Sequence, residues 1–238
     1  MQKVSVIIPA HNEEDNLDEA VTRVDNLLSR ARVDGEIIVV DDNSTDSTPK
    51  LADLLAAKIG RVRVVHRTDG MKGFGMAIRS GIEAARGDYV VPFMADLSDD
   101  PEDILKLLRK VKEGYDIVIG SRFISGGRAY GYSFMKLIAN RLYNFFLRML
   151  FGLKLKDSTN AFKLYNRKLL SNLKLESKGF EINAEIIIKA YLMGAKIAEI
   201  PTEWRERGAG KSKMKLLKVW KDYGLTAIRL FLRHFLQR

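Results

Sequence analysis

The sequence predicts an α/β fold in which helices flank a mainly parallel sheet, and three observations lead to that prediction. Short apolar segments alternate with segments of helical periodicity through most of the chain, as in consecutive βαβ units. The short segments are continuously apolar, which is typical of strands buried on both faces. Polar residues follow directly where several of these strands end, at the edge of the sheet where such folds bind ligands.

Runs of Val, Ile and Leu mark the expected strands. They lie at 4–9, 36–40, 62–65, 89–93, 115–120 and 196–201. Helical spacing of apolar residues predicts helices after Asn12, which suits an N-cap, and after Asp46. Further helices are expected at 76–85, 101–113 and 179–193. In the helix that begins near 101, Asp100 suits the N-cap and Pro101 the first helical position.

Two further helices are expected to be amphipathic. The helix at about 133–152 is apolar except for one arc of polar residues. That arc consists of Lys136, Asn140, Arg141, Asn144 and Arg148. Core packing explains this pattern, and so does a helix in a membrane interface with its basic arc at the headgroups. The basic helix over 214–236 carries Trp and Phe along one side, which is typical of a membrane-surface element.

Length and composition predict one α/β domain over 1–213, followed by the basic amphipathic helix within 214–238. The 238 residues are 46% hydrophobic and include no cysteine, which excludes disulfides and thiolate metal sites. The N-terminus begins a strand at once, and no uncharged apolar run is long enough to span a bilayer. We therefore expect a cytoplasmic protein that is attached peripherally to the membrane.

The net charge of +10 is concentrated at the end of the chain. Residues 207–238 contain nine Lys and Arg but only one acid, while the rest of the chain is nearly neutral. A nucleic-acid-binding protein would carry its basic charge more evenly over the fold. We expect no nucleic-acid partner. A membrane surface is the expected partner of the tail, and a separate membrane protein is the alternative left open.

Three of the predicted strands end in residues that can bind ligands. His11 and Glu13 follow the first strand, Asp42 ends the second, and Asp96 follows the fourth. The carboxyl ends of parallel strands share one edge, so we expect a single cleft. Carboxylates near Asp96 suit a hard divalent cation that would clamp substrate phosphates, although a solvated acidic loop has the same pattern. Asp42 suits a hydrogen bond to a nucleobase or ribose, or a helix N-cap.

A glycine-rich turn precedes the helix at 76–85. Gly73 and Gly75 would let backbone N–H groups approach a phosphate, but glycines before a helix also serve as ordinary turn residues. Further along, Glu185 lies at helical spacing from Glu181. It is interpreted as a surface acid or as an ion-pair partner of Lys189, and it is not assigned to the site.

Several ordered motifs resemble those of one enzyme family. They are VIIPAHNE at 6–13, VVDDNSTD at 39–46, KGFG at 72–75, ADLS at 95–98, GSRF at 120–123, DSTNAFKLY at 157–165 and the segment 201–213. This set resembles the inverting GT-A glycosyltransferases of family 2. Within that family it is most similar to dolichyl-phosphate mannose synthases and other polyprenyl-phosphate glycosyltransferases.

The resemblance implies a GT-A, Rossmann-like fold and a set of ligand contacts. The residues implied to hold the nucleotide are Pro9, His11, Glu13, Val40 and Asp42. Those implied to border the metal and diphosphate are Ala95, Asp96 and Ser98, with Asp96 and Ser98 as ligands of Mg²⁺ or Mn²⁺. Arg122, Arg207 and Lys213 would contact the phosphates of donor or acceptor, and Asp96, Arg122 and Arg207 would be the catalytic residues.

The implied reaction is inverting transfer of a sugar from a nucleotide-diphosphate sugar to a polyprenyl (dolichyl) phosphate at the cytoplasmic face of a membrane. Mannose from GDP-mannose is the expected donor. The alternatives are a UDP-sugar donor, or a membrane-peripheral scaffold that binds a nucleotide sugar with weakened catalysis. Two departures bear on these alternatives. Met94 replaces the first carboxylate of the family's Asp-Ala-Asp motif, which weakens the metal site or shifts it to Asp96 with Ser98 or Asp99, and His11 replaces a tyrosine.

Overall fold

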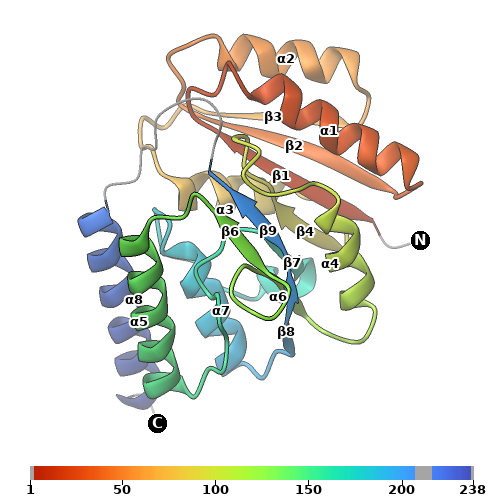
Figure 1. Ribbon diagram of the computed structural model, residues 1–238. Coiled ribbons are helices and arrows are strands. Elements are labelled where there is room, and N and C mark those ends of the chain that lie inside the picture. The colour runs from red at the N-terminus through yellow and green to blue at the C-terminus, as the bar shows by residue number, and fades with distance from the viewer. Residues whose placement is uncertain (1–2, 207–215, 237–238) are drawn as a thin grey trace.

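The computed structural model describes residues 3–206 and 216–236, and in this part seven strands form one central sheet (Figure 1). The strands are β1 (Val4–Ala10), β2 (Gly35–Asp42), β3 (Val62–Arg67), β4 (Tyr89–Pro92), β5 (Ile117–Ser121), β7 (Lys163–Asn166) and β8 (Ile197–Pro201). Their order in the sheet is β3-β2-β1-β4-β7-β5-β8. All neighbours pair in parallel except β7, which is antiparallel to β4 and β5. The predicted mainly parallel α/β fold is confirmed.

Helices cover both faces of this sheet. They are α1 (Leu17–Arg30), α2 (Thr48–Lys58), α3 (Phe74–Ala84), α4 (Asp103–Val111), α5 (Phe134–Phe151), α6 (Arg167–Ser171), α7 (Ile182–Leu192) and α8 (Leu216–Leu236). One buried cluster joins the sheet to α1, α2 and α4. A second cluster on the other face joins it to α3 and α5–α8. Because both faces are covered, the strands are continuously apolar.

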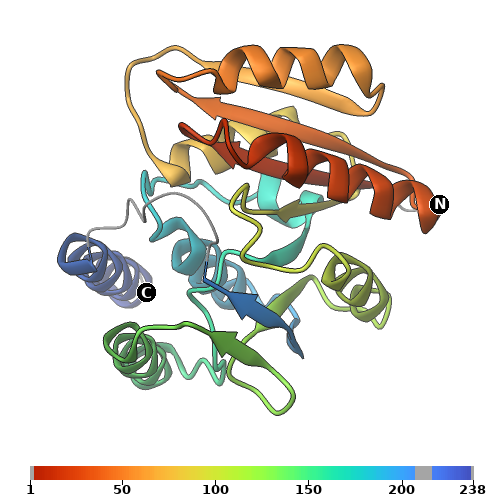
Figure 2. The same ribbon diagram turned by 45° about the horizontal axis from the view of Figure 1, so that its top comes forward.

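The second half of the chain adds elements that the sequence did not reveal. A second, two-stranded sheet pairs β6 (Arg128–Tyr130) with β9 (Glu203–Arg205). These strands and β7 have only three or four residues each, too few for a periodic pattern to emerge. Figure 2 shows this small sheet on the side of the molecule where α5 lies.

Several expected helix starts differ from the structure. Helix α3 begins at Phe74 and not at 76, and α7 begins at Ile182 and not at 179. Asn12 is not an N-cap. Its φ is +53°, its side-chain oxygen accepts a hydrogen bond from the Thr45 N–H at 2.8 Å, and α1 starts only at Leu17. Helix α4 begins at Asp103, two residues later than expected. The Asp100 carboxylate accepts from the Glu102 N–H at 3.0 Å and closes a turn that precedes the helix.

The last helix packs on the body of the fold. Tyr223, Ala227 and Leu230 of α8 are buried in the cluster that includes α5 and α7. Tyr143 and Tyr223 stack edge to face with their centroids 5.1 Å apart, and the Tyr143 hydroxyl donates to the Tyr223 carbonyl. Figure 1 shows α5 and α8 side by side at one end of the molecule.

Candidate active site

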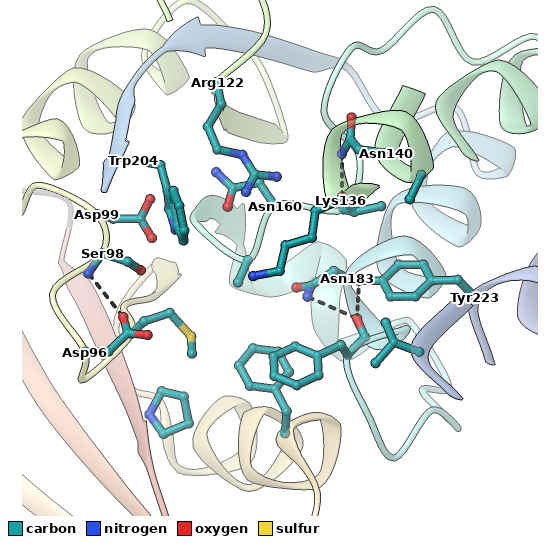
Figure 3. A pocket seen from close by; sticks show the side chains of 18 of the residues that line it. Asp96, Ser98, Asp99, Arg122, Lys136, Asn140, Asn160, Asn183, Trp204 and Tyr223 are labelled. Atoms are coloured by element: carbon teal, nitrogen blue, oxygen red, sulfur yellow. Dashed lines mark hydrogen bonds between the residues drawn. The ribbon is translucent and has the colours of Figure 1, made fainter. Parts of the chain in front are cut away.

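A pocket of about 800 Å³ lies at the carboxyl edge of the sheet and extends between α5, α7 and α8. Its walls come from both halves of the chain. The N-terminal half supplies residues that follow β1, β2 and β4, and the C-terminal half supplies side chains of α5, α7, α8 and β9. Figure 3 shows the acidic turn around Asp96 on one wall and the helical residues Lys136 and Asn140 on the other. The single cleft expected from the strand ends is therefore present.

On the N-terminal side, Asp42 is buried and engaged by the protein itself. One carboxylate oxygen accepts from the Arg67 guanidinium, and the other accepts from the Gly73 N–H at 2.7 Å. The Asp42 carbonyl accepts from Nδ1 of His11 at 2.8 Å. This network fixes the ends of β1 and β2 and the turn before α3 relative to one another, so this part of the pocket is organised before a ligand binds.

The glycines before α3 serve close packing. A Cβ at Gly73 would lie 2.3 Å from the Lys178 carbonyl oxygen, and one at Gly75 would lie 2.7 Å from the carbonyl oxygens of Ser177 and Gly179. The Gly75 N–H donates to the Lys178 carbonyl at 2.9 Å. Because these N–H groups donate to acceptors within the protein, they are not available to a phosphate. The two glycines are therefore turn and packing residues, as the second of the two interpretations proposed.

The segment that packs on these glycines is held by Glu185 of α7. This carboxylate is buried and accepts from the backbone N–H groups of Glu176 and Ser177, at 3.0 and 2.8 Å. Burial opposes its ionisation, but the hydrogen bonds from Lys189 and Ser177 outweigh burial and lower its pKa. The expected ion pair with Lys189 is present at 2.6 Å. Glu185 is thus a buried structural residue and not a surface acid.

The acidic turn after β4 presents its oxygens to the pocket. Met94, Asp96 and Ser98 all line it, and an Asp96 carboxylate oxygen accepts from the Ser98 N–H at 3.1 Å. Leu97 between them has a φ of +56°, a conformation that turns the chain sharply. Over 3–206 and 216–236, no group of three or more His, Asp or Glu side chains is placed to hold a metal ion.

Asp99 follows on the same turn and is 3% exposed. Burial, opposed by Arg122, raises the pKa of its carboxyl to about 7. Its Oδ1 has no hydrogen-bond partner in the described structure. Backbone hydrogen bonds connect the turn to β9. Asp99 and Trp204 form an isolated antiparallel β-bridge, and the Arg205 N–H donates to the Ser98 carbonyl at 2.8 Å.

Arg122 reaches the pocket in a buried ion pair. Its Nε and one terminal nitrogen donate to the two oxygens of Asp157 at 2.7 and 2.8 Å. The guanidinium carbon lies 4.9 Å from the ring centre of Tyr132 and 5.1 Å from that of Phe123. Burial opposes the charge, but Asp157 outweighs burial and raises the pKa of Arg122. Asp157 therefore balances the charge that Arg122 brings to the pocket.

The polar arc of α5 points inward. Asn140 and Asn144 are buried, and the Asn140 amide donates to Asp157 at 3.1 Å and to the Thr159 hydroxyl at 2.7 Å. Lys136, one turn earlier, extends its amine into the pocket (Figure 3). Within the described ranges this amine has no ion-pair partner. The arc therefore reaches the pocket through Lys136 and Asn140. Asn144 is buried beside Asn140 and accepts from the Ser158 N–H at 2.9 Å, while Arg141 and Arg148 are exposed.

One arm of the pocket is apolar. Phe74 and Phe180 stack with their ring centres 4.6 Å apart, and the Phe180 carbonyl accepts from the Tyr223 hydroxyl at 2.7 Å. The arm is completed by residues of α5 and α8. They are Leu142, Tyr143, Phe146, Val219 and Trp220. A ligand that fits the whole pocket therefore has a charged part near Asp96 and Lys136 and an apolar part between the helices.

Most of the residues expected at the site do line this pocket. These are Pro9, His11, Glu13, Asp42, Asp96, Ser98 and Arg122. Val40 and Ala95 are buried in the two hydrophobic clusters, so their side chains do not line it. Arg207 and Lys213 lie outside the described residues. The ligand roles of all these residues remain predictions.

The sequence interpretation missed Lys136, Asp157 and Trp204 as parts of the site. A signal existed for the first, because Lys136, Asn140 and Asn144 are spaced four residues apart and form one stripe on an otherwise apolar helix. Such a stripe marks a polar side of the helix, although the pattern alone does not tell whether that side faces solvent or a site. The Asp157–Arg122 pair joins residues 35 positions apart, so no local pattern indicates it.

The comparisons with known proteins establish the family. A sequence model of the family described as "Glycosyl transferase family 2" matches residues 5–174. The chain belongs to this family. It is 37% identical over 215 residues to the dolichol-phosphate mannosyltransferase of Pyrococcus furiosus, covering 90% of this chain and 59% of that protein. It is 36% identical over 220 residues to the polyprenol monophosphomannose synthase of Mycolicibacterium smegmatis, covering 90% and 81%.

Solved structures share the fold. Glucosyl-3-phosphoglycerate synthase from Mycobacterium tuberculosis, in complex with Mn²⁺, UDP and phosphoglyceric acid, superposes with a TM-score of 0.74 at 23% identity. The match covers 97% of this chain and 78% of that one. The expected GT-A fold is thereby confirmed. In the described part of the chain, no helix combines the length and apolar character needed to cross a bilayer.

Proposed function

We propose that this family 2 glycosyltransferase transfers mannose from GDP-mannose to a polyprenyl phosphate, with inversion at the anomeric carbon. The observation that carries the proposal is the form of the pocket. It joins an acidic turn, a cationic centre and an apolar arm, which suit a sugar diphosphate, a phosphate and an isoprenoid chain respectively. The names of the archaeal and mycobacterial relatives support this choice of acceptor and sugar.

The acidic turn fits a divalent cation despite Met94. Mg²⁺ and Mn²⁺ are commonly held by one or two carboxylates together with substrate phosphates. Asp96 supplies such a carboxylate at the pocket and Ser98 an oxygen beside it, so the donor diphosphate would complete the site. A cation bound there would neutralise charge on the leaving diphosphate.

The chain's own residues account for the acceptor side of the reaction. A phosphate oxygen of the acceptor is already anionic near neutral pH, so it can attack the anomeric carbon without a strong protein base. The new bond joins that oxygen to the anomeric carbon, and the bond to the diphosphate breaks with its electron pair, releasing GDP. Lys136 and Arg122 orient the acceptor phosphate. Attack in line with the leaving group inverts the anomeric centre.

We also propose that the protein attaches peripherally to the cytoplasmic face of the membrane through α5 and α8. Large apolar side chains are exposed on both helices. They are Phe134, Met135, Leu142, Phe145, Met149, Trp220, Leu225, Ile228, Leu232, Phe235 and Leu236. Because Asn140 and Asn144 of α5 are buried, these apolar side chains lie on the outward side of the helix, where they would meet the bilayer. The basic residues of the tail would meet anionic lipids of the cytoplasmic leaflet.

Transfer of labelled sugar to dolichyl phosphate in liposomes tests the proposed function. GDP-mannose and several UDP-sugars are supplied in turn, each with Mg²⁺, Mn²⁺ or a chelator. The expected result is a labelled product that extracts into organic solvent, forms from GDP-mannose and requires the cation. Folded protein that binds nucleotide sugars but forms no product from any donor would contradict transfer and favour a scaffold.

A further inference from the structure

The Asp99 carboxylate is a buried group whose hydrogen bonding the protein leaves incomplete. The residue is 3% exposed, yet its Oδ1 has no partner among the described residues. Buried polar atoms are paired in the great majority of cases, and an unpaired one is costly. Because Asp99 also lines the pocket, a bound ligand is a natural source of the missing donor.

Two residues beside Asp99 direct hydrogen bonds to other carboxylates. The Ser98 N–H donates to Asp96, and the Nε and one terminal nitrogen of Arg122 donate to Asp157. The β9 strand covers the turn from outside through its bridge at Trp204. Arg122 acts on Asp99 as a nearby charge without a hydrogen bond. The fold therefore places a carboxylate at the pocket wall and leaves its Oδ1 without a hydrogen bond among the described residues.

The position of Asp99 indicates which part of a ligand it meets. Figure 3 shows it on the same wall as Asp96 and Ser98, on the side toward Arg122, with Trp204 beside it. In the proposed reaction the diphosphate lies near Asp96 and the acceptor phosphate near Arg122 and Lys136. The sugar must lie between the two phosphates, because its anomeric carbon bonds to one and is attacked by the other.

We propose that Asp99 accepts a hydrogen bond from a hydroxyl group of the transferred sugar and so determines which sugar is accepted. This inference rests on the proposed function and adds a specificity residue to it. A site built around a buried polar group rejects an analogue that lacks the matching hydroxyl, because the group is left unpaired when that analogue binds. Asp99 would thus act on the sugar, and not on the nucleotide.

Binding measurements on Asp99→Asn distinguish a contact with the sugar of the donor from a contact with its nucleotide. The affinities of GDP and GDP-mannose are measured by calorimetry with Mn²⁺ and without acceptor. The substitution keeps the size of the side chain and removes its charge. We expect GDP affinity within about twofold of wild type and GDP-mannose affinity lowered about tenfold, because the uncharged amide oxygen of Asn accepts a weaker hydrogen bond than the carboxylate. Asp100→Asn, an exposed neighbour on the same turn, is the matched control and should change neither.

A second measurement uses the wild-type protein and needs no variant to fold. Monodeoxy analogues of GDP-mannose are compared with the parent. One analogue, lacking the hydroxyl that Asp99 contacts, should bind wild type more weakly by a similar factor and should bind wild type and Asp99→Asn almost equally. Equal binding of all the analogues and the parent to wild type would overturn the proposal.

Two other outcomes would also overturn it. An equal loss of GDP and GDP-mannose affinity in Asp99→Asn, with a higher Mn²⁺ requirement, would make Asp99 part of a cation site. Unchanged affinity for GDP and GDP-mannose would show that Asp99 contacts neither the nucleotide nor the sugar. Either result can occur while wild type still transfers mannose to dolichyl phosphate, so failure here is distinct from failure of the proposed function.

Discussion

The two sides of the pocket differ in how the protein prepares them. On the side proposed to hold the nucleotide, called the nucleotide side below, Asp42, His11 and the turn at Gly73 already bond to one another and to Arg67. On the side proposed to hold the acceptor, called the acceptor side below, Lys136 extends into the pocket without an ion-pair partner in the described ranges, and apolar side chains of α5 and α8 are exposed. The polar groups named on the nucleotide side are hydrogen-bonded within the protein. The Lys136 charge and the exposed apolar side chains on the acceptor side are available to a ligand and to lipid.

This difference follows from the ligands that each side is proposed to hold. A soluble nucleotide sugar arrives from water, so a preorganised, hydrogen-bonded site binds it without the cost of ordering the protein. A polyprenyl phosphate stays in a membrane, so the surface that receives it must itself meet lipid. The acceptor side therefore exposes apolar surface that a soluble enzyme would bury.

The largest effect is expected at the acidic turn that the two sides share. Asp96→Ala removes the only carboxylate of this turn that lines the pocket apart from the buried Asp99. Loss of charge neutralisation at the leaving diphosphate should lower kcat by about a thousandfold or more. Initial-rate assays with saturating Mn²⁺ measure it. Asp100→Asn is the control and should keep normal activity. Near-normal activity of Asp96→Ala would contradict the assignment of the divalent cation to Asp96.

The next effect concerns stability on the acceptor side. Asp157→Asn keeps the shape of a fully buried side chain but leaves the Arg122 cation, 7% exposed, without its counter-charge. Breaking a buried pair in this way should lower the free energy of unfolding by about 3–5 kcal/mol. Urea denaturation measures it. Glu102→Gln, which removes an exposed pair with Arg30, should cost less than about 1 kcal/mol; equal losses would contradict a special role for the buried pair.

Removing the positive charge of Lys136 from the pocket tests the acceptor side directly. Lys136→Met keeps the aliphatic length and removes the charge that the acceptor phosphate would contact. We expect KM for polyprenyl phosphate to rise about ten- to a hundredfold, while KM for GDP-mannose stays within about twofold. Arg148→Met removes a basic residue from the exposed side of the same helix and should leave both constants unchanged. A rise confined to the GDP-mannose constant would move Lys136 to the nucleotide side.

Charges on the exposed apolar side of α5 and α8 test the membrane contact. Phe145→Asp and Leu232→Asp each place a carboxylate where an apolar group would enter lipid. Each should weaken liposome binding about tenfold or more, because burial of such a side chain is worth about 1.5–3 kcal/mol. Transfer to a short, water-soluble prenyl phosphate should persist. Leu54→Asp on α2, at a site that is 67% exposed, is the control, and an equal loss there would contradict a specific membrane surface.

The smallest effect is expected at the edge of the nucleotide side. His66 bonds to Asp41 at 3.1 Å and to Asp53 at 3.0 Å, and these carboxylates raise its pKa above the ordinary value of 6.5. Protonated His66 therefore adds stability below pH 6.5 that is lost as the pH rises through the raised pKa. The stability difference between wild type and His66→Gln should shrink by less than about 1 kcal/mol from pH 6 to 9. A difference that grows with pH in urea denaturation would reverse this assignment.

The sequence was most informative about the nucleotide side. Strands β1, β2 and β4 are uniform apolar runs, and the residues that follow them share one edge because parallel strands end together. This reasoning placed His11, Asp42 and Asp96 in one pocket. It could not show that Arg67 and Gly73 occupy the two oxygens of Asp42, because those contacts depend on how the turn before α3 packs.

The acceptor side could be predicted only in part. The amphipathic pattern of α5 was evident, but the pattern does not say which side faces inward. The structure buries the two asparagines of the arc, with Asn140 on Asp157 and Asn144 on the Ser158 N–H, and leaves Arg141 and Arg148 exposed. A headgroup contact of these two arginines stays a prediction. Strands β6 and β9 contain three residues each, and their pairing depends on contacts between distant parts of the chain.

The configuration of the product tests the central claim that both substrates meet in one pocket. Wild-type protein is supplied with GDP-mannose and a prenyl phosphate, and the anomeric configuration of the isolated mannosyl phosphate is determined by NMR. Direct attack by the acceptor phosphate predicts a product whose configuration is opposite to that of the donor. Retained configuration, or mannose released to water with no prenyl product, would contradict the account.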